Sequence, residues 1–339
     1  MKMADKQSPA HRLYSRHQLS DSSLIVEADH LEVLHRLWAA GALTKHQFIE
    51  SMYQYHRVLF QYSRRLRDNI VDSLHISDQG VELTSRAGVR FACDPDDMYG
   101  IPFGAFSFGE VERTAGDLLR RFMTEEGVFF DIGANVGWYS CHFAQRSPKV
   151  QIYAFEPLPV TYAWLKRNID LNGFTNIKAF NIGLGEKEEI MTFYFRPDMT
   201  GAASARNITE STNASAYNCS VRRLDDCWRE IGRNPDLIKC DVEGAELFVF
   251  RGGQACLAEA QPIIFCEMLR KWSAKFDYTP NDIISFLAQL GYACFEPAEN
   301  GLKAFERMTE ATAETNFFFL HRDKHQAIIT ASATMGLQA

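Results

Sequence analysis

The sequence predicts an α/β fold: a mostly parallel sheet of seven strands with helices on both faces. Three observations predict it. From residue 128 onward, short apolar runs alternate with segments of helical pattern, and strands that alternate with helices assemble into a parallel sheet. The first apolar run leads into a glycine-rich turn, and the second ends in an acidic residue, Glu156. In open α/β sheets, ligands bind beyond the carboxyl ends of the strands, so these two ends point to a site.

The expected elements follow one another in a regular order. Strands are expected at 128–132, 151–155, 177–181, 236–241, 262–267, 292–296 and 316–320. Helices are expected at 138–146, 158–172, 244–251 and 280–290. The stretch 186–223 interrupts the alternation with a pattern that predicts a hairpin, 190–195 with 219–222, around a polar loop. Loops of this length are typical of functional lids or of disordered segments.

Residues 1–78 are expected to form a helical N-terminal extension. Apolar side chains recur at helical spacing to about His75, and Gly41 and Thr44 mark a stop and a new N-cap between two helices. The apolar stripes must pack on the main domain, at the substrate entrance or on a second subunit, and the last case predicts a homodimer through these helices. A β-hairpin is expected at 81–84 and 89–93, the main domain at 79–325 and a flexible tail at 326–339.

The composition is that of a globular protein and argues against a nucleic-acid partner. Hydrophobic residues make up 46% of the chain, and the formal net charge is -7, whereas a protein that grips a phosphate backbone needs a basic face. No apolar run approaches the roughly 18 residues of a membrane span, and the polar N-terminus lacks a signal peptide. The eight cysteines form no Cys-x-x-Cys pair, so we expect buried thiols. These features predict a cytoplasmic protein.

The first strand and the turn after it carry the strongest functional signal. The strand runs through Asp131, and the turn that follows contains Gly133, Asn135 and Gly137 before a helix begins. Glycine permits a tight turn and lets a ligand approach the backbone closely. Nineteen residues after Gly137, the second strand is followed by Glu156, whose carboxylate can accept hydrogen bonds from both hydroxyls of a ribose. The pattern predicts a nucleoside-containing cofactor.

Two cofactors fit such an arrangement, NAD and S-adenosylmethionine (SAM). The NAD fingerprint, Gly-x-Gly-x-x-Gly, is missing, because Gly133 is followed by Ala-Asn-Val-Gly. A carboxylate at Asp131 would repel the pyrophosphate of NAD, whereas it would attract the cationic amino-acid part of SAM. The sequence therefore favours SAM as the cofactor.

The next strand ends carry further candidate site residues. Asn181 and Ile182 close the third strand, where they could supply polar and apolar walls for an adenine. Asp241 closes the fourth strand, where the transferable methyl group of the cofactor is expected, so it is also a candidate cofactor-binding residue. Glu243 follows it, and Glu267 ends the fifth strand. A single acid at a strand end can equally be a helix N-cap. Suitable residues at four strand ends in order indicate a site.

Several of these residues lie in motifs that resemble one protein family. The motifs are Phe-Asp-Ile-Gly-Ala-Asn-Val-Gly-Trp-Tyr-Ser at 130–140, Ala-Phe-Glu-Pro at 154–157, Asn168 with Asn172, Val-Arg-Arg-Leu-Asp-Asp at 221–226 and Ile-Lys-Cys-Asp-Val-Glu-Gly-Ala-Glu at 238–246. Over about residues 105–297 the chain resembles the FkbM-type methyltransferases. Residues 1–80 lie outside the resemblance, and Cys240 stands where the family often has an aliphatic residue.

The resemblance implies a class I, Rossmann-like methyltransferase fold with SAM as the cofactor. On the motif positions it adds Trp138 and Pro157 to the cofactor-binding residues. It further implies transfer of a methyl group to a hydroxyl of a sugar, a glycolipid or a secondary metabolite.

A hydroxyl acceptor needs a base within hydrogen-bond reach and a geometry close to attack. The candidate catalytic residues are Asp241, Glu243 and Glu267, although Glu267 could instead form a salt bridge with Arg270 or Lys271. Carboxylates suit Mg²⁺, but base and capping roles explain these acids equally well, so no metal is predicted.

Two other functions stay open. The protein could methylate nitrogen on a small molecule, although the Asn/Asp-Pro-Pro-Tyr motif used for exocyclic amines is missing and residues 234–237 echo it only faintly. It could also be a SAM-binding scaffold that acts through its helical N-terminus. The acids at 241, 243 and 267 count against an inactive scaffold.

Overall fold

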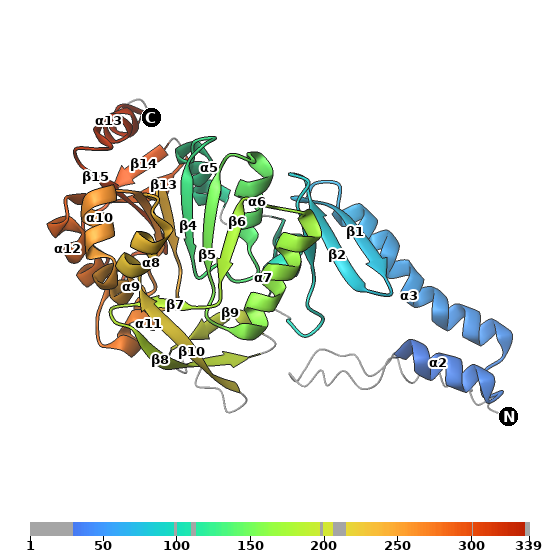
Figure 1. The fold of residues 1–339 in the computed structure, drawn as a ribbon. Coiled ribbons are helices and arrows are strands. Elements are labelled where there is room, and N and C mark those ends of the chain that lie inside the picture. The colour runs from blue at the N-terminus through green and yellow to red at the C-terminus, as the bar shows by residue number, and fades with distance from the viewer. Residues whose placement is uncertain are drawn as a thin grey trace. The chain divides into compact units, whose positions relative to one another are not determined.

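The computed structural model describes residues 30–97, 100–109, 113–196, 199–205, 215–299 and 301–335, and the chain divides into two compact units, 1–68 and 69–339. In the first unit, helices α2 (His30–Ala39) and α3 (Lys45–Arg65) follow one another (Figure 1). The expected N-cap, Thr44, is confirmed: its side chain accepts a hydrogen bond from the backbone N–H of Gln47, 3.3 Å away, and the Gln47 side chain accepts one from the Thr44 N–H.

The second unit begins with a small antiparallel sheet of β1 (Val71–Ser77), β2 (Gly80–Ser85) and β3 (Arg90–Ala92). The expected hairpin is confirmed as β2 and β3. Helical structure, expected to about His75, instead ends at Arg65. The strand β1 replaces it because Asn69 separates the two elements: its side chain accepts a hydrogen bond from the Val71 N–H and donates one to the Phe106 carbonyl.

The main sheet has eight strands in the order β14-β13-β15-β12-β11-β4-β5-β6. The strands are β4 (Val128–Ile132), β5 (Gln151–Phe155), β6 (Ile177–Phe180), β11 (Leu237–Cys240), β12 (Ile263–Glu267), β13 (Tyr292–Ala298), β14 (Gly301–Ala304) and β15 (Asn316–His321). The five strands from β12 to β6 are parallel, and β15 and β13 run antiparallel to their neighbours. All seven expected strands are confirmed, and the short β14 adds an eighth at the edge.

Helices cover both faces of this sheet, as expected for a class I fold (Figure 1). One apolar cluster joins the sheet to α5 (Arg113–Phe122) and α6 (Trp138–Arg146). The other joins it to α8 (Leu224–Ile231), α9 (Glu246–Gly252), α10 (Gln254–Ala260) and α12 (Pro280–Gln289). Neighbours such as Phe129 and Phe130 belong to opposite clusters, because successive side chains of a strand point to opposite faces.

The remaining elements are a second sheet and several further helices. The sheet has the strand order β7-β10-β8-β9 and consists of β7 (Gly183–Gly185), β8 (Glu189–Arg196), β9 (Met199–Ser204) and β10 (Ser215–Arg223). The antiparallel pair β8 and β10 confirms the expected hairpin, and β9 is additional. The other helices are α4 (Ile101–Phe108), α7 (Pro159–Asn172), α11 (Arg270–Ser273), the 3-10 helix η1 (Ala274–Phe276) and α13 (Gln326–Met335).

The C-terminal segment differs from the flexible tail expected at 326–339. Residues 326–335 form α13, because Ile328 and Ile329 pack against the apolar cluster of α5 and α6; residues 336–339 lie outside the described part of the chain. All eight cysteines are buried free thiols, as expected. Within the described residues, no helix combines the length and the apolar character that a membrane crossing requires.

Candidate functional site

The turn between β4 and α6 is shaped by residues with positive φ: Gly133 (+75°), Asn135 (+50°) and Gly137 (+87°). A Cβ atom on Gly133 would lie 1.8 Å from the backbone oxygen of Asp241, and one on Gly137 would lie 2.6 Å from Cδ1 of Leu165. Both positions therefore need glycine for conformation and for space. The turn thereby comes into direct backbone contact with the end of β11.

Glu156 follows β5 and joins this turn to the next one. One carboxylate oxygen accepts a hydrogen bond from the Asn135 N–H and the other from the Leu158 N–H, both at 3.0 Å. Burial raises the pKa of Glu156 to about 7, although these two N–H groups and the Lys239 ammonium oppose that rise. Sequence reasoning placed Glu156 beside the glycine turn, and the structure brings the two together.

Asp131 is fully buried, which changes its expected role. Its Oδ2 accepts hydrogen bonds from the Ser140 hydroxyl, at 2.6 Å, and from the Ser140 N–H, at 3.2 Å. Burial raises the pKa of Asp131, and the Lys239 ammonium opposes this. Because Asp131 has no exposed surface, it can act on a ligand through its charge and by holding the start of α6, but not by contact. Trp138, 8% exposed, also faces inward and stacks on Phe91 at 4.9 Å between ring centroids.

The residues at the end of β6 lie against the end of β5. The Asn181 side-chain amide donates hydrogen bonds to the backbone carbonyls of Glu156 and Pro157, both at 2.9 Å. Asn181 is exposed, while Pro157 and Ile182 are partly buried. Amide, proline and isoleucine side chains thus flank the Glu156 position, as the order of the strand ends predicts.

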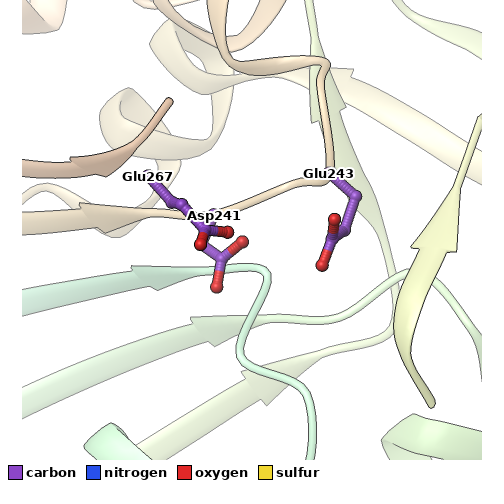
Figure 2. Close-up of side chains that lie close together, drawn as sticks. All are labelled: Asp241, Glu243 and Glu267. Carbon is purple, nitrogen blue, oxygen red and sulfur yellow. The ribbon is translucent and has the colours of Figure 1, made fainter. Parts of the chain in front are cut away.

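Three carboxylates converge at the ends of β11 and β12 (Figure 2). Asp241 follows β11, Glu267 ends β12, and Glu243 lies in the loop before α9 with φ +53°. One oxygen from each lies within 4.8 Å of the other two, and all three residues are partly exposed. The structure therefore brings together the three candidate catalytic residues, which lie up to 26 positions apart in the sequence.

Within this acidic cluster (Asp241, Glu243 and Glu267), the electrostatics raise the pKa of Glu243. Desolvation raises the pKa of Glu243 well above its usual value, with further increases from Asp241 and Glu246, while Lys239 opposes the rise. Three carboxylates at this spacing have the donor set of a divalent-cation site. The Lys239 ammonium, 3.2 Å from Oδ2 of Asp241, already places a positive charge beside the cluster.

Two residues of this region were not predicted from the sequence, Lys239 and Glu246. Lys239 donates a hydrogen bond to the Gly133 carbonyl at 2.8 Å. Glu246 accepts hydrogen bonds from the N–H groups of Val242, at 3.2 Å, and Gly244, at 3.0 Å, so it shapes the loop that carries Glu243. The sequence did contain a signal for Lys239: it is a charged residue in the middle of an apolar strand. A charged side chain buried in such a strand needs a partner.

With this geometry in place, comparisons with known proteins identify the domain. Residues 131–294 match the model of the methyltransferase FkbM domain. Similar proteins include methyltransferase 1 of Beauveria bassiana, with 29% identity over 38% of this chain and 59% of that protein. The 2-O-methyltransferase NoeI of Sinorhizobium fredii is 29% identical over 45% of this chain and 66% of its own length. The hexuronic acid methyltransferase AglP of Haloferax volcanii is 30% identical over 40% of this chain and 53% of its own length.

The chain thus spans less than two thirds of the length of these curated relatives. Among solved structures, the FkbM methyltransferase of Methylobacillus flagellatus is 18% identical over 62% of this chain and 48% of that one, with a TM-score of 0.40. The family match spans the glycine turn, Glu156 and the acidic cluster. Residues 131–294 of this chain are therefore similar to the methyltransferase FkbM domain, and the cofactor of this family is S-adenosylmethionine.

Proposed function

We propose that the protein is a SAM-dependent O-methyltransferase that acts on a hydroxyl of a sugar, a glycolipid or a secondary metabolite. The contact between the glycine turn and the acidic cluster carries the proposal. Because the backbone oxygen of Asp241 closes on Gly133, a cofactor held at the turn and an acceptor held at the carboxylates would be neighbours. Such proximity is the main requirement of methyl transfer.

The residues of the turn fit this cofactor. Gly133 and Gly137 allow the positive-φ backbone that shapes the turn, and Asn135 connects the turn to Glu156. Each carboxylate oxygen of Glu156 accepts one backbone hydrogen bond and retains a lone pair, so it can still accept a hydrogen bond from a ribose hydroxyl. Asn181, Ile182 and Pro157 would flank the adenine, with Asp131 and Trp138 supporting the turn from the interior.

The acidic cluster supplies what an oxygen nucleophile needs. SAM carries a methyl group on a cationic sulfur, which makes that methyl susceptible to attack. In the transfer, the acceptor oxygen would bond to the methyl carbon while the bond from that carbon to sulfur breaks and S-adenosylhomocysteine leaves. The acceptor hydroxyl loses its proton in this step, and a carboxylate can receive that proton. Asp241 has a side chain that is 33% exposed and therefore accessible to an acceptor. Asp241 or Glu243 orients or deprotonates the hydroxyl, and Glu267 is the third candidate base.

The names of two relatives support oxygen as the acceptor atom and a sugar as its carrier. NoeI is a 2-O-methyltransferase, and AglP is a hexuronic acid methyltransferase. Nitrogen methylation and a scaffold role are the alternatives. A neutral amine can react without a base as strong as the one that a hydroxyl requires, and a scaffold requires no base. Three convergent carboxylates therefore favour oxygen as the acceptor atom.

Calorimetric titration with SAM and with its demethylated product tests the cofactor assignment. Micromolar binding by the wild type is expected to be lost in Glu156→Ala and kept in Glu126→Ala, which alters only a surface ion pair with Lys149. Transfer of labelled methyl to hydroxylated glycans and metabolites then tests the reaction. If only amine acceptors are labelled, the oxygen assignment is wrong; if the wild type binds SAM and methylates no acceptor, the scaffold role gains support.

A further inference from the structure

Lys239 lies between the glycine turn and the acidic cluster. It is the one buried lysine or arginine in the part of the chain that the structure describes. In the sheet, Lys239 of β11 pairs in register with Asp131 of β4 and with Phe265 of β12. Residues opposite one another in adjacent strands point to the same face, so the Lys239 and Asp131 side chains share one side of the sheet.

The ammonium group of Lys239 contacts three oxygens that belong to different parts of the site. Nζ lies 2.8 Å from the carbonyl oxygen of Gly133, 3.2 Å from Oδ2 of Asp241 and 3.8 Å from Oδ1 of Asp131. It also lies 5.7 Å from the centroid of the Tyr139 ring on α6. The Lys239 side chain is only 6% exposed, whereas that of Asp241 is 33% exposed. A ligand can thus reach Asp241 while Lys239 holds that carboxylate from the interior.

We propose that Lys239 is a positioning residue for methyl transfer: its ammonium group fixes the backbone of the glycine turn and the carboxylate of Asp241 relative to each other. The inference rests on the proposed function and deepens it. A lysine ammonium has three donors, and hydrogen bonds from a charged donor are strong. Because one nitrogen holds both groups, the cofactor turn and the base cannot drift apart independently.

A simpler role for Lys239 would be to neutralise the buried Asp131. The distances argue against that role alone, because Nζ is closer to Gly133 and to Asp241 than it is to Asp131. Ser140 holds Oδ2 of Asp131, and Lys239 faces its Oδ1 only at 3.8 Å, beyond hydrogen-bond distance. Lys239→Met alone leaves Asp131 without its cation and is expected to destabilise the fold. The double variant Asp131→Asn/Lys239→Met removes both charges at nearly constant volume, so it separates the two roles.

The first test compares the side-chain carboxyl signals of ¹³C-labelled aspartate by NMR at one fixed pH. The wild type, Lys239→Met and the double variant are compared, with Lys166→Met as a control that changes only the exposed Lys166–Asp170 pair. Loss of a signal in Asp241→Asn assigns Asp241. Its carboxyl ¹³C chemical shift is expected to change in both Lys239 variants, because the ammonium group 3.2 Å from Oδ2 is removed. This readout needs neither cofactor nor acceptor, and an unchanged Asp241 signal overturns the proposal.

The second test measures methyl transfer by the same four proteins. Both Lys239 variants are expected to lose about 100-fold in kcat, as misplaced reacting groups do. The double variant is expected to regain wild-type stability without regaining activity. Recovery of both turnover and the wild-type Asp241 signal in the double variant would show that Lys239 only neutralises Asp131. Absence of turnover in the wild type counts against the proposed function, and the NMR comparison still decides the role of Lys239.

Discussion

The backbone oxygen of Asp241 lies 1.8 Å from the position that a Cβ atom on Gly133 would occupy. This contact joins the glycine turn to the acidic cluster without a side chain between them. An alanine at this position would force the end of β11 away from the turn, because two non-bonded atoms cannot approach so closely without displacement.

Gly133→Ala is therefore expected to abolish SAM binding and to lower the free energy of unfolding by more than the cost of positive φ alone. Gly173→Ala is the matched control, since Gly173 also has positive φ (+66°) but no atom lies within 4 Å of its Cβ position. The control should lose roughly 1–2 kcal/mol and keep normal SAM affinity. Calorimetry and urea unfolding measure both quantities. If the two variants had equal SAM affinity and equal free energies of unfolding, the close contact would have no role in binding.

The strands were predictable because their apolar runs reflect burial on both faces of a parallel sheet. Phe129 and Phe130, for example, pack into clusters on opposite faces, and both had to be apolar. The edge strand β14 was not predicted, because its four residues pair on one side only and carry little apolar pattern. The strand β1 was also not predicted, and helix was expected to about residue 75 instead. Most of β1 is exposed, so it too carries little apolar strand pattern.

Only those site residues that lie at the ends of strands could be predicted from the sequence. Asp241 and Glu267 each follow or end a strand, and neighbouring parallel strands bring such positions together. The role of Lys239 depends on the register of β11 against β4, which the local sequence does not encode. The burial of Asp131 likewise depends on Ser140, which folds back over it from the following helix.

Glu246 makes stability depend on pH. Burial raises its pKa to about 7 in the folded protein, from an ordinary value near 4.5, so the folded state binds a proton more tightly than the unfolded state. Its contribution to stability is therefore greatest below pH 4.5 and falls as the pH rises to about 7. The loss is on the order of 3 kcal/mol.

Glu246→Gln is expected to flatten this dependence in urea unfolding between pH 5 and pH 8. Its amide oxygen can still accept the N–H hydrogen bonds of Val242 and Gly244. Glu259→Gln, on an exposed position of α10, should keep the wild-type slope. A Glu246→Gln protein with the wild-type slope would assign the effect to other groups, such as Glu156, whose pKa is also raised to about 7.

The N-terminal extension is expected to mediate self-association. Along α3, Ile49, Tyr53 and Phe60 are 54%, 52% and 60% exposed, and large apolar side chains in one row are typical of an interface. Light scattering of the full chain should give the mass of a dimer, and Ile49→Glu/Phe60→Glu should give a monomer. Ile190→Glu, which changes an equally exposed side chain on β8, should leave the mass unchanged. A monomeric wild type would rule out this role for residues 24–75.

Methyl transfer is expected to persist in excess chelator, although the acidic cluster has the donor set of a cation site. The raised pKa of Glu243 favours its protonated form, which lowers the negative charge that would attract a metal. Lys239 also supplies a positive charge 3.2 Å from Asp241. Turnover should therefore be the same after dialysis against EDTA and after addition of Mg²⁺. Activity lost in EDTA and restored by Mg²⁺ would instead make Asp241, Glu243 and Glu267 ligands of a divalent cation, because carboxylate oxygens are the ligands that Mg²⁺ prefers.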